Sequence, residues 1–182
     1  MCGAGSVALA PKWFGFQATA SDISRRGQII GSALVANDLT ALSCHHISKL
    51  FKENGAHHGT RIQRPDQLRL SDWKFLTNAV AVADFQPEPI RGLLLLTLIK
   101  ATLRLFPMSL PNATDAAAAA SADYDRISPR RLGHYLNARS SLTPAWLWRV
   151  AQQVNGGVIG GQGAVERGDA CDVITRVAPD VV

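Results

Sequence analysis

Basic and aromatic side chains are concentrated between residues 126 and 149, and together they could bind a nucleic acid. This stretch contains five arginines and no acidic residue. Arginine forks match phosphate oxygens, while aromatic rings stack on bases. Arg130 and Arg131 also fall in the first turn of a predicted helix, where free N–H groups favour anions. The contacts predicted here are Arg126, Arg130, Arg131, Arg139, Arg149 and Tyr135.

A solvated basic face over a helical core explains the same stretch without any ligand. Leu132, Tyr135 and Leu136 have the spacing of a core stripe. Trp146 and Trp148 flank one residue, so we expect one of them to point inward. Both interpretations stay open on the sequence alone.

A second basic group lies at the end of one predicted helix and in the polar loop after it. It comprises Lys49, Lys52, Arg61, Arg64 and Arg69. The three arginines are added to the predicted nucleic-acid contacts. The preceding segment resembles a helix that lies in a DNA groove, but the loop of about 15 residues is too long for a helix-turn-helix.

Histidines form the one cluster with metal-ligand chemistry: His45, His46, His57 and His58, with Cys44 adjacent. Neighbouring helical residues point about 100° apart, so only one of His45 and His46 would join the loop pair. No HExxH, HxH or CxxC spacing is present. We therefore predict no metal site, and a metal-dependent enzyme using this cluster is the least favoured alternative.

Other catalytic patterns are missing from the sequence. There is no GxSxG elbow, and the glycines from Gly156 to Gly163 lack the Lys-Ser/Thr of a phosphate-binding loop. Acidic residues are scattered, which gives no paired-carboxylate site. We predict no catalytic residue and no cofactor, and we consider an enzyme less favoured than a binding protein.

Composition agrees with a folded chain that has anionic partners. The 182 residues are 47% hydrophobic and 18% charged, with a net charge of +5. The three cysteines form no CxxC pair, which favours free thiols in the reducing cytoplasm. The longest apolar stretch, 92–106, is interrupted by Lys100 and Arg104, and a membrane span needs about 20 apolar residues.

Helical periodicity dominates the first half of the chain. One helix is expected from Ser21, where Gly27 and Gly31 would let another helix approach, and a second from Asp38 to Asn54. A third begins near Ser71 and carries Trp73, Leu76, Val80 and Ala83 inward. The next runs from Pro89 to Phe106 and is apolar nearly all round, which predicts a central position.

Three further helices are expected in the second half. Asp115 precedes an alanine run, Ser128-Pro129 precedes the basic stretch, and Thr143-Pro144 opens a helix that Asn155 and two glycines end. From Gly156 the glycines predict a flexible linker or hairpin, followed by a short strand or an arm. These elements give an all-α fold of about six or seven helices.

The predicted organisation is an irregular N-terminal arm (1–20), a helical domain (21–155) and a glycine-rich C-terminal arm (156–182). The function hypothesis is a structural protein that binds RNA or DNA, such as a coat or nucleocapsid-type subunit. Its terminal arms would exchange between neighbouring copies. The alternative is a helical module that assembles with proteins through exposed apolar ends, its charge serving only solubility.

Overall fold

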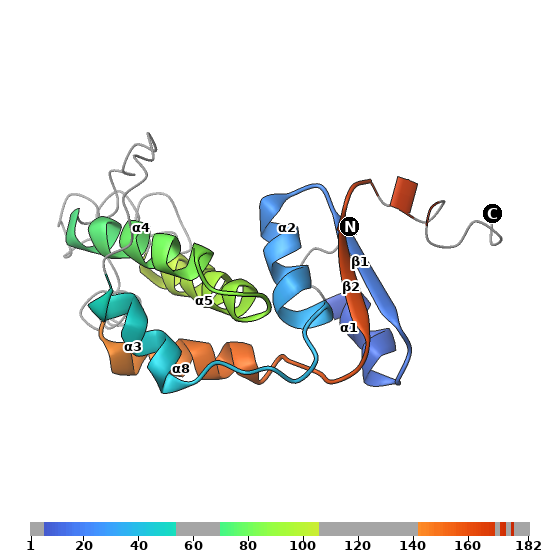
Figure 1. Cartoon of the computed structure of the whole chain (residues 1–182), viewed down its shortest axis with the longest axis horizontal. Coiled ribbons are helices and arrows are strands. Elements are labelled where there is room, and N and C mark those ends of the chain that lie inside the picture. The colour runs from blue at the N-terminus through green and yellow to red at the C-terminus, as the bar shows by residue number, and fades with distance from the viewer. Residues whose placement is uncertain (1–5, 54–69, 106–141, 170–171, 174–175, 177–182) are drawn as a thin grey trace, which may run out of the picture. The chain divides into compact units, whose positions relative to one another are not determined.

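The computed structural model of the chain describes residues 6–53, 70–105, 142–169, 172–173 and 176 (Figure 1). These residues are mainly helical, as predicted, but they also contain a two-stranded parallel sheet that an all-α fold does not include. The chain forms two compact units. Unit 1 comprises 1–43, 85–96 and 151–182, and unit 2 comprises 44–84 and 97–150.

Unit 1 begins with α1 (Ser6–Trp13) and β1 (Ala18–Asp22), in a segment expected to be irregular. Strand β1 pairs in parallel with β2 (Gly163–Arg167), from Ala18 opposite Gly163 to Asp22 opposite Arg167. The two strands lie side by side in Figure 1, next to helix α2 (Arg25–Ile30). The predicted strand after the glycines therefore starts earlier, within the glycine-rich stretch itself.

Helix α2 continues directly into a π-helical segment, η1 (Gly31–Val35). A Cβ atom on Gly31 would lie 2.5 Å from the Cγ2 atom of Val165, so the absence of a side chain lets η1 pack against β2. The sequence predicted that Gly27 and Gly31 admit another helix. The close helix–helix approach instead occurs at Gly92, where a Cβ atom would lie 3.0 Å from the Ala33 nitrogen.

Lys12 is the most unusual core residue of unit 1. Its side chain is 1% exposed, and its Nζ atom donates to the carbonyl oxygens of Val35 (2.8 Å), Leu34 (3.5 Å) and Asn37. Burial lowers the pKa of the Lys12 ammonium, and the nearby Asp38 carboxylate opposes that shift. Lys12 thus satisfies carbonyls at the end of η1 and fixes α1 to it.

Side-chain amides hold the connecting segments of unit 1 in place. Asn37 donates to the Ala33 and Thr40 carbonyl oxygens and accepts from the Thr40 N–H. Asn155 accepts from the Leu42 N–H and donates to its carbonyl, both at 2.9 Å. The Gly161 N–H donates to the Asp38 carboxylate. The predicted flexible linker is therefore bound to residues 38–42.

Unit 2 has an apolar and aromatic core. It contains α3 (Cys44–Lys52), α4 (Leu70–Asp84), and the larger parts of α5 (Ile90–Leu105) and α8 (Pro144–Asn155). Ile47 and Leu50 are buried on α3, and Leu76 is buried on α4. The Phe51 and Phe75 rings stack at 4.5 Å between centroids.

Helix α5 matches its prediction, since its residues from Gly92 to Leu98 are all buried. Among the described residues, no helix combines the length and the hydrophobicity that a membrane crossing requires. Helix α8 also begins and ends as predicted, and the Trp146 N–H donates to the Thr143 hydroxyl at 3.2 Å.

Three local predictions are wrong. The helix expected from Asp38 begins at Cys44, because Asn37 and Asn155 bind the backbone of the intervening residues. On α4 the predicted Leu76 and Ala83 are buried, together with Ala79 and Val82, but Val80 is exposed and Trp73 is only half-buried. On α8 neither Trp146 nor Trp148 is fully buried, because the core-facing residues are Leu147, Val150, Ala151 and Val154.

Candidate anion-binding site

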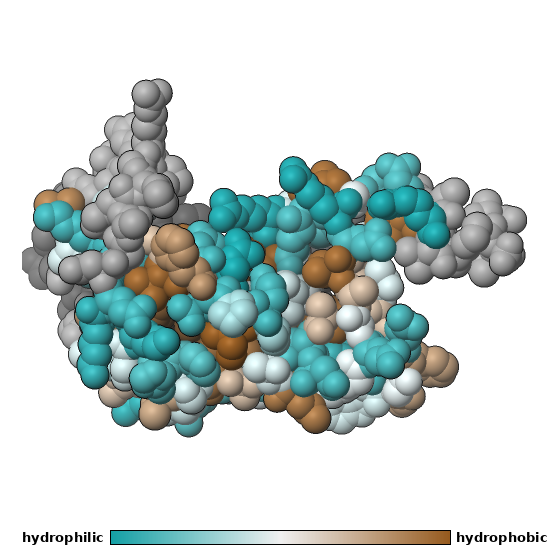
Figure 2. All heavy atoms as spheres, viewed as in Figure 1, coloured by the Kyte–Doolittle hydropathy of each residue, from teal (hydrophilic) through white to brown (hydrophobic). Residues whose placement is uncertain are grey.

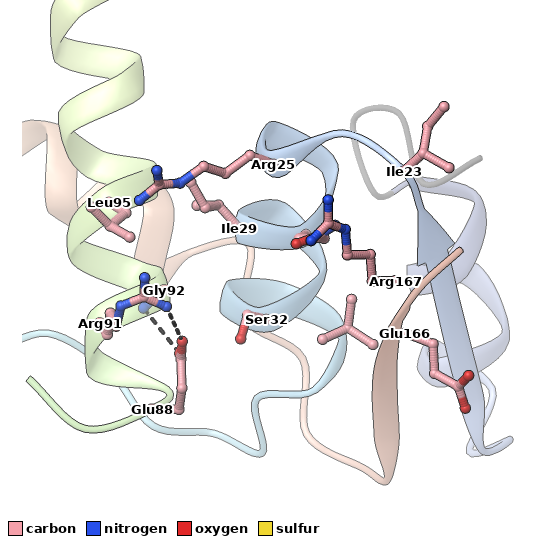
Figure 3. A pocket seen from close by; sticks show the side chains of 12 residues that line it. Ile23, Arg25, Ile29, Ser32, Glu88, Arg91, Gly92, Leu95, Glu166 and Arg167 are labelled. Atoms are coloured by element: carbon pink, nitrogen blue, oxygen red, sulfur yellow. Dashed lines mark hydrogen bonds and ion pairs between the residues drawn. The ribbon is translucent and has the colours of Figure 1, made fainter. Parts of the chain in front are cut away.

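A cavity of about 480 Å³ lies within unit 1, at the carboxyl ends of the paired strands. In open parallel sheets, ligand sites commonly lie at this end of the strands. The cavity is lined by residues of four segments: Ile23 after β1; Arg25, Gln28, Ile29 and Ser32 of α2 and η1; Glu88, Arg91, Gly92 and Leu95 at the start of α5; and Val165, Glu166 and Arg167 of β2. Figure 3 shows these side chains.

Local hydrogen bonds fix the turn that carries Arg25. The Ser24 side chain accepts from the Gly27 N–H at 3.0 Å and caps helix α2. The Ser24 N–H in turn donates to the Asp22 carboxylate at 2.8 Å. Because Asp22 is itself the end of β1, the strand and helix are joined by a short, defined turn, which places Arg25 at the cavity.

The α5 side of the cavity is held by Glu88. Its carboxylate accepts from the Gly92 N–H and from the Arg91 guanidinium, both at 3.1 Å (Figure 3). Gly92 has no side chain, which lets this turn approach Ala33. Arg91 is therefore oriented by a carboxylate of its own turn, which reduces the positive charge that it offers to a ligand.

Three guanidinium groups contribute positive charge to the cavity from three separate elements. In Figure 3, Arg25 extends from α2 toward α5, and Arg167 extends from β2 toward α2. Among the described residues, no carboxylate forms an ion pair with Arg167. Glu166 points away from α2 and pairs with Arg176 at 3.2 Å. Of the two acidic residues that line the cavity, Glu88 is therefore the one that pairs with a cavity arginine.

Of the predicted nucleic-acid contacts, Arg149 is the one that lies among the described residues. Arg149 lies on α8, is exposed, and belongs to unit 2. The other predicted contacts lie outside the described residues: Arg61, Arg64, Arg69, Arg126, Arg130, Arg131, Tyr135 and Arg139. Sequence reasoning did not select Arg25, Arg91 or Arg167. The sequence does place an arginine next to each of two helix starts, at Ser24 and at Pro89. No sequence pattern, however, indicates that these two positions lie close together.

The histidine cluster is also only partly described. His45 and His46 lie on α3 with ring centroids 6.5 Å apart, while His57 and His58 are outside the described residues. Burial lowers the pKa of His46, and the charges of His45 and Lys49 lower it further. Within the described ranges, no group of three or more His, Cys, Asp or Glu side chains could hold a metal ion.

Comparison with known proteins found no matching family model, curated protein or solved structure. The chemistry of the cavity and the charge of the chain are therefore the basis for a functional proposal.

Proposed function

We propose that this chain is a structural nucleic-acid-binding protein, of the coat or nucleocapsid type, that contacts phosphates through distributed arginines. The observation that carries the proposal is the cavity lined by Arg25, Arg91 and Arg167. Each guanidinium group carries a fork of donors that suits phosphate oxygens. The net charge of +5 adds a long-range attraction for a polyanion.

The arginines of the 126–149 stretch supply further phosphate contacts in this proposal, as do Arg61, Arg64 and Arg69. Arg149 is exposed on α8 and open to solvent. Contacts spread over many arginines fix a protein along a backbone without reading its sequence. Such binding is what a protein that coats a nucleic acid requires.

Self-association through the terminal segments is part of the proposal. The pairing of β1 with β2 joins the two terminal segments of the chain. The same strand pairing could form between two copies. An exchange of terminal segments would then reuse contacts that one copy already makes within itself. A reducing cytoplasmic location is also proposed, consistent with the free, exposed thiol of Cys44.

A protein-assembly module is the second candidate, and one observation favours it. Trp13, Phe14 and Phe16 are 72%, 77% and 66% exposed, in a row just before β1. Figure 2 shows apolar residues reaching the surface at several separate places on the visible face. Exposed aromatic side chains are enriched at protein interfaces, and such an interface needs no nucleic acid.

Binding of the full-length protein to a fluorescent single-stranded RNA across a salt series tests the proposal. We expect affinity that falls steeply as salt rises, because each phosphate contact releases counterions. Arg130→Ala with Arg131→Ala should weaken binding and reduce the salt dependence. No binding at low salt, together with oligomers that form without RNA, would reject the proposal in favour of the assembly module.

A further inference from the structure

Helix α3, in unit 2, carries a basic face that is separate from the cavity of unit 1. At about 100° of rotation per residue, positions 45, 49 and 52 fall within about 60° of one another around the helix. These positions are His45, Lys49 and Lys52, which we call the basic face of α3. His45 and Lys52 are exposed, and Lys49 is partly exposed. The helix contains no acidic residue, so this face carries no negative charge.

The opposite side of α3 is buried. Ile47 and Leu50 are 1% and 0% exposed, and the Phe51 ring stacks on Phe75 of α4. Figure 1 shows α3 and α4 side by side. Because the apolar side of α3 packs in the core of unit 2, the basic face is held in a fixed orientation away from that core.

No carboxylate of the described residues forms an ion pair with Lys49 or Lys52. Glu53 directly follows the helix, and its backbone carbonyl oxygen accepts from the Asn78 amide of α4 at 2.8 Å. Asp72 of α4 is buried, whereas Glu53 is exposed. Glu53 is therefore the acidic residue that borders the basic face, and the two ammonium groups are left for an anionic partner.

A phosphate backbone fits the basic face of α3 better than a lipid surface does. A helix that lies on a membrane inserts its apolar side, but the apolar side of α3 is already buried. The basic face extends about 10 Å along the helix axis, at about 1.5 Å per residue. Phosphates of one duplex strand are about 3.4 Å apart along the duplex axis, so the face is long enough for more than one of them.

We infer that the basic face of α3 contacts the phosphate backbone of a nucleic acid, with Lys49 and Lys52 as phosphate ligands and His45 beside them. The choice of a nucleic acid among polyanions rests on the proposed function. The strand can be RNA or DNA, because the phosphate chemistry is the same. Lysine ammonium groups act as point charges on a backbone, so this contact should depend on salt and not on base sequence.

Binding of the full-length protein to two fluorescent RNA strands of unrelated sequence, each across a salt series, tests this inference. Lys49→Gln and Lys52→Gln each remove one positive charge from the face. Lys74→Gln is the matched control, because Lys74 is exposed on α4 of the same unit but lies outside the face. Glu53→Gln instead removes the negative charge that borders the face.

The double variant Lys49→Gln, Lys52→Gln should reduce the slope of log affinity against log salt by about two, since two phosphate contacts are lost. The reduction should be the same for both RNA sequences. Lys74→Gln should leave the slope nearly unchanged. Glu53→Gln should tighten binding by about two-fold at low salt, because one repulsive charge is removed. A variant that had merely lost its fold would not show this gain.

Equal slopes for the double variant and Lys74→Gln, with RNA that the unmodified protein binds, would overturn the inference while the proposed function stands. No RNA binding by the unmodified protein at low salt would reject the proposed function and the inference together. Vesicles of phosphatidylserine and phosphatidylcholine are the second probe. Vesicle binding that the double variant loses, without any RNA binding, would assign the basic face to a membrane surface and overturn the inference.

Discussion

Lys12 and the arginine-lined cavity are two cationic sites in the same compact unit, and they differ in what surrounds the charge. The Lys12 ammonium is buried, and carbonyl oxygens of the chain itself occupy its donors. The cavity arginines line an open volume at the other end of the strand pair, where Arg91 pairs with the Glu88 carboxylate. The first arrangement stabilises the fold, whereas the second places guanidinium groups around a volume that a ligand could enter.

This contrast predicts opposite responses to mutation. The largest effect should come from Lys12→Met, which keeps the side-chain length but removes the donor shared by three carbonyl groups. We expect a loss of about 3 kcal/mol in the free energy of unfolding, the cost of leaving buried acceptors unsatisfied. Urea denaturation measures it. Lys74→Met, at an exposed position on α4, is the control and should stay within about 0.5 kcal/mol.

Asn155→Ala should give the next largest effect. It removes both hydrogen bonds between the Asn155 amide and the Leu42 backbone, each contributing about 1 kcal/mol. The expected loss is about 2 kcal/mol by denaturation. Gln152→Ala, at an exposed position of the same helix, should be nearly neutral. Equal losses for the two variants would show that the amide does not bind the 38–42 segment as described.

Arg167→Gln should show the reverse of Lys12→Met. Arg167 is exposed at the end of β2, so the free energy of unfolding of the variant should change by less than about 0.5 kcal/mol. Its affinity for RNA should nevertheless fall, because one phosphate contact is lost. Thermal unfolding and calorimetry on the same sample separate the two effects. A large loss of stability in this variant would make Arg167 a structural residue like Lys12.

The smallest effect concerns unit 2, where the His46 imidazole is partly buried. Its pKa is lowered in the folded chain, so the unfolded chain binds a proton first as pH falls through 6.5. The free energy of unfolding is therefore at its full value above pH 6.5 as far as His46 is concerned. It falls as the pH drops from 6.5 through the lowered pKa of the folded state. His46→Gln should flatten this part of the stability profile between about pH 8 and about pH 5. An unchanged slope would contradict the shift.

Local signals predicted the helices that begin with strong capping or proline residues. Pro89 and Thr143-Pro144 placed α5 and α8 correctly, and the apolar run of α5 identified the core. The strand pair was beyond local reasoning, because Ala18 pairs with Gly163 from the far end of the chain. The same holds for the helix expected at Asp38, where Asn155 overrides the local preference.

The cavity could not be predicted for a related reason. Arg25, Arg91 and Arg167 are far apart in the sequence, and each looks like an ordinary solvated arginine beside an element end. They share a site because β2 returns to β1 and because Gly92 lets α5 approach η1. Sequence clustering instead favoured the 126–149 stretch, and most of those residues lie outside the described part of the chain.

The most direct measurement is the salt dependence of RNA affinity for the double variant Arg25→Gln, Arg167→Gln, compared with Arg26→Gln. If the cavity arginines contact a phosphate of bound RNA, the slope of log affinity against log salt should shrink by about one or more in the double variant. It should change less in Arg26→Gln. Equal slopes in the two variants, or no RNA binding by the unmodified protein, would contradict a phosphate-binding role for this cavity.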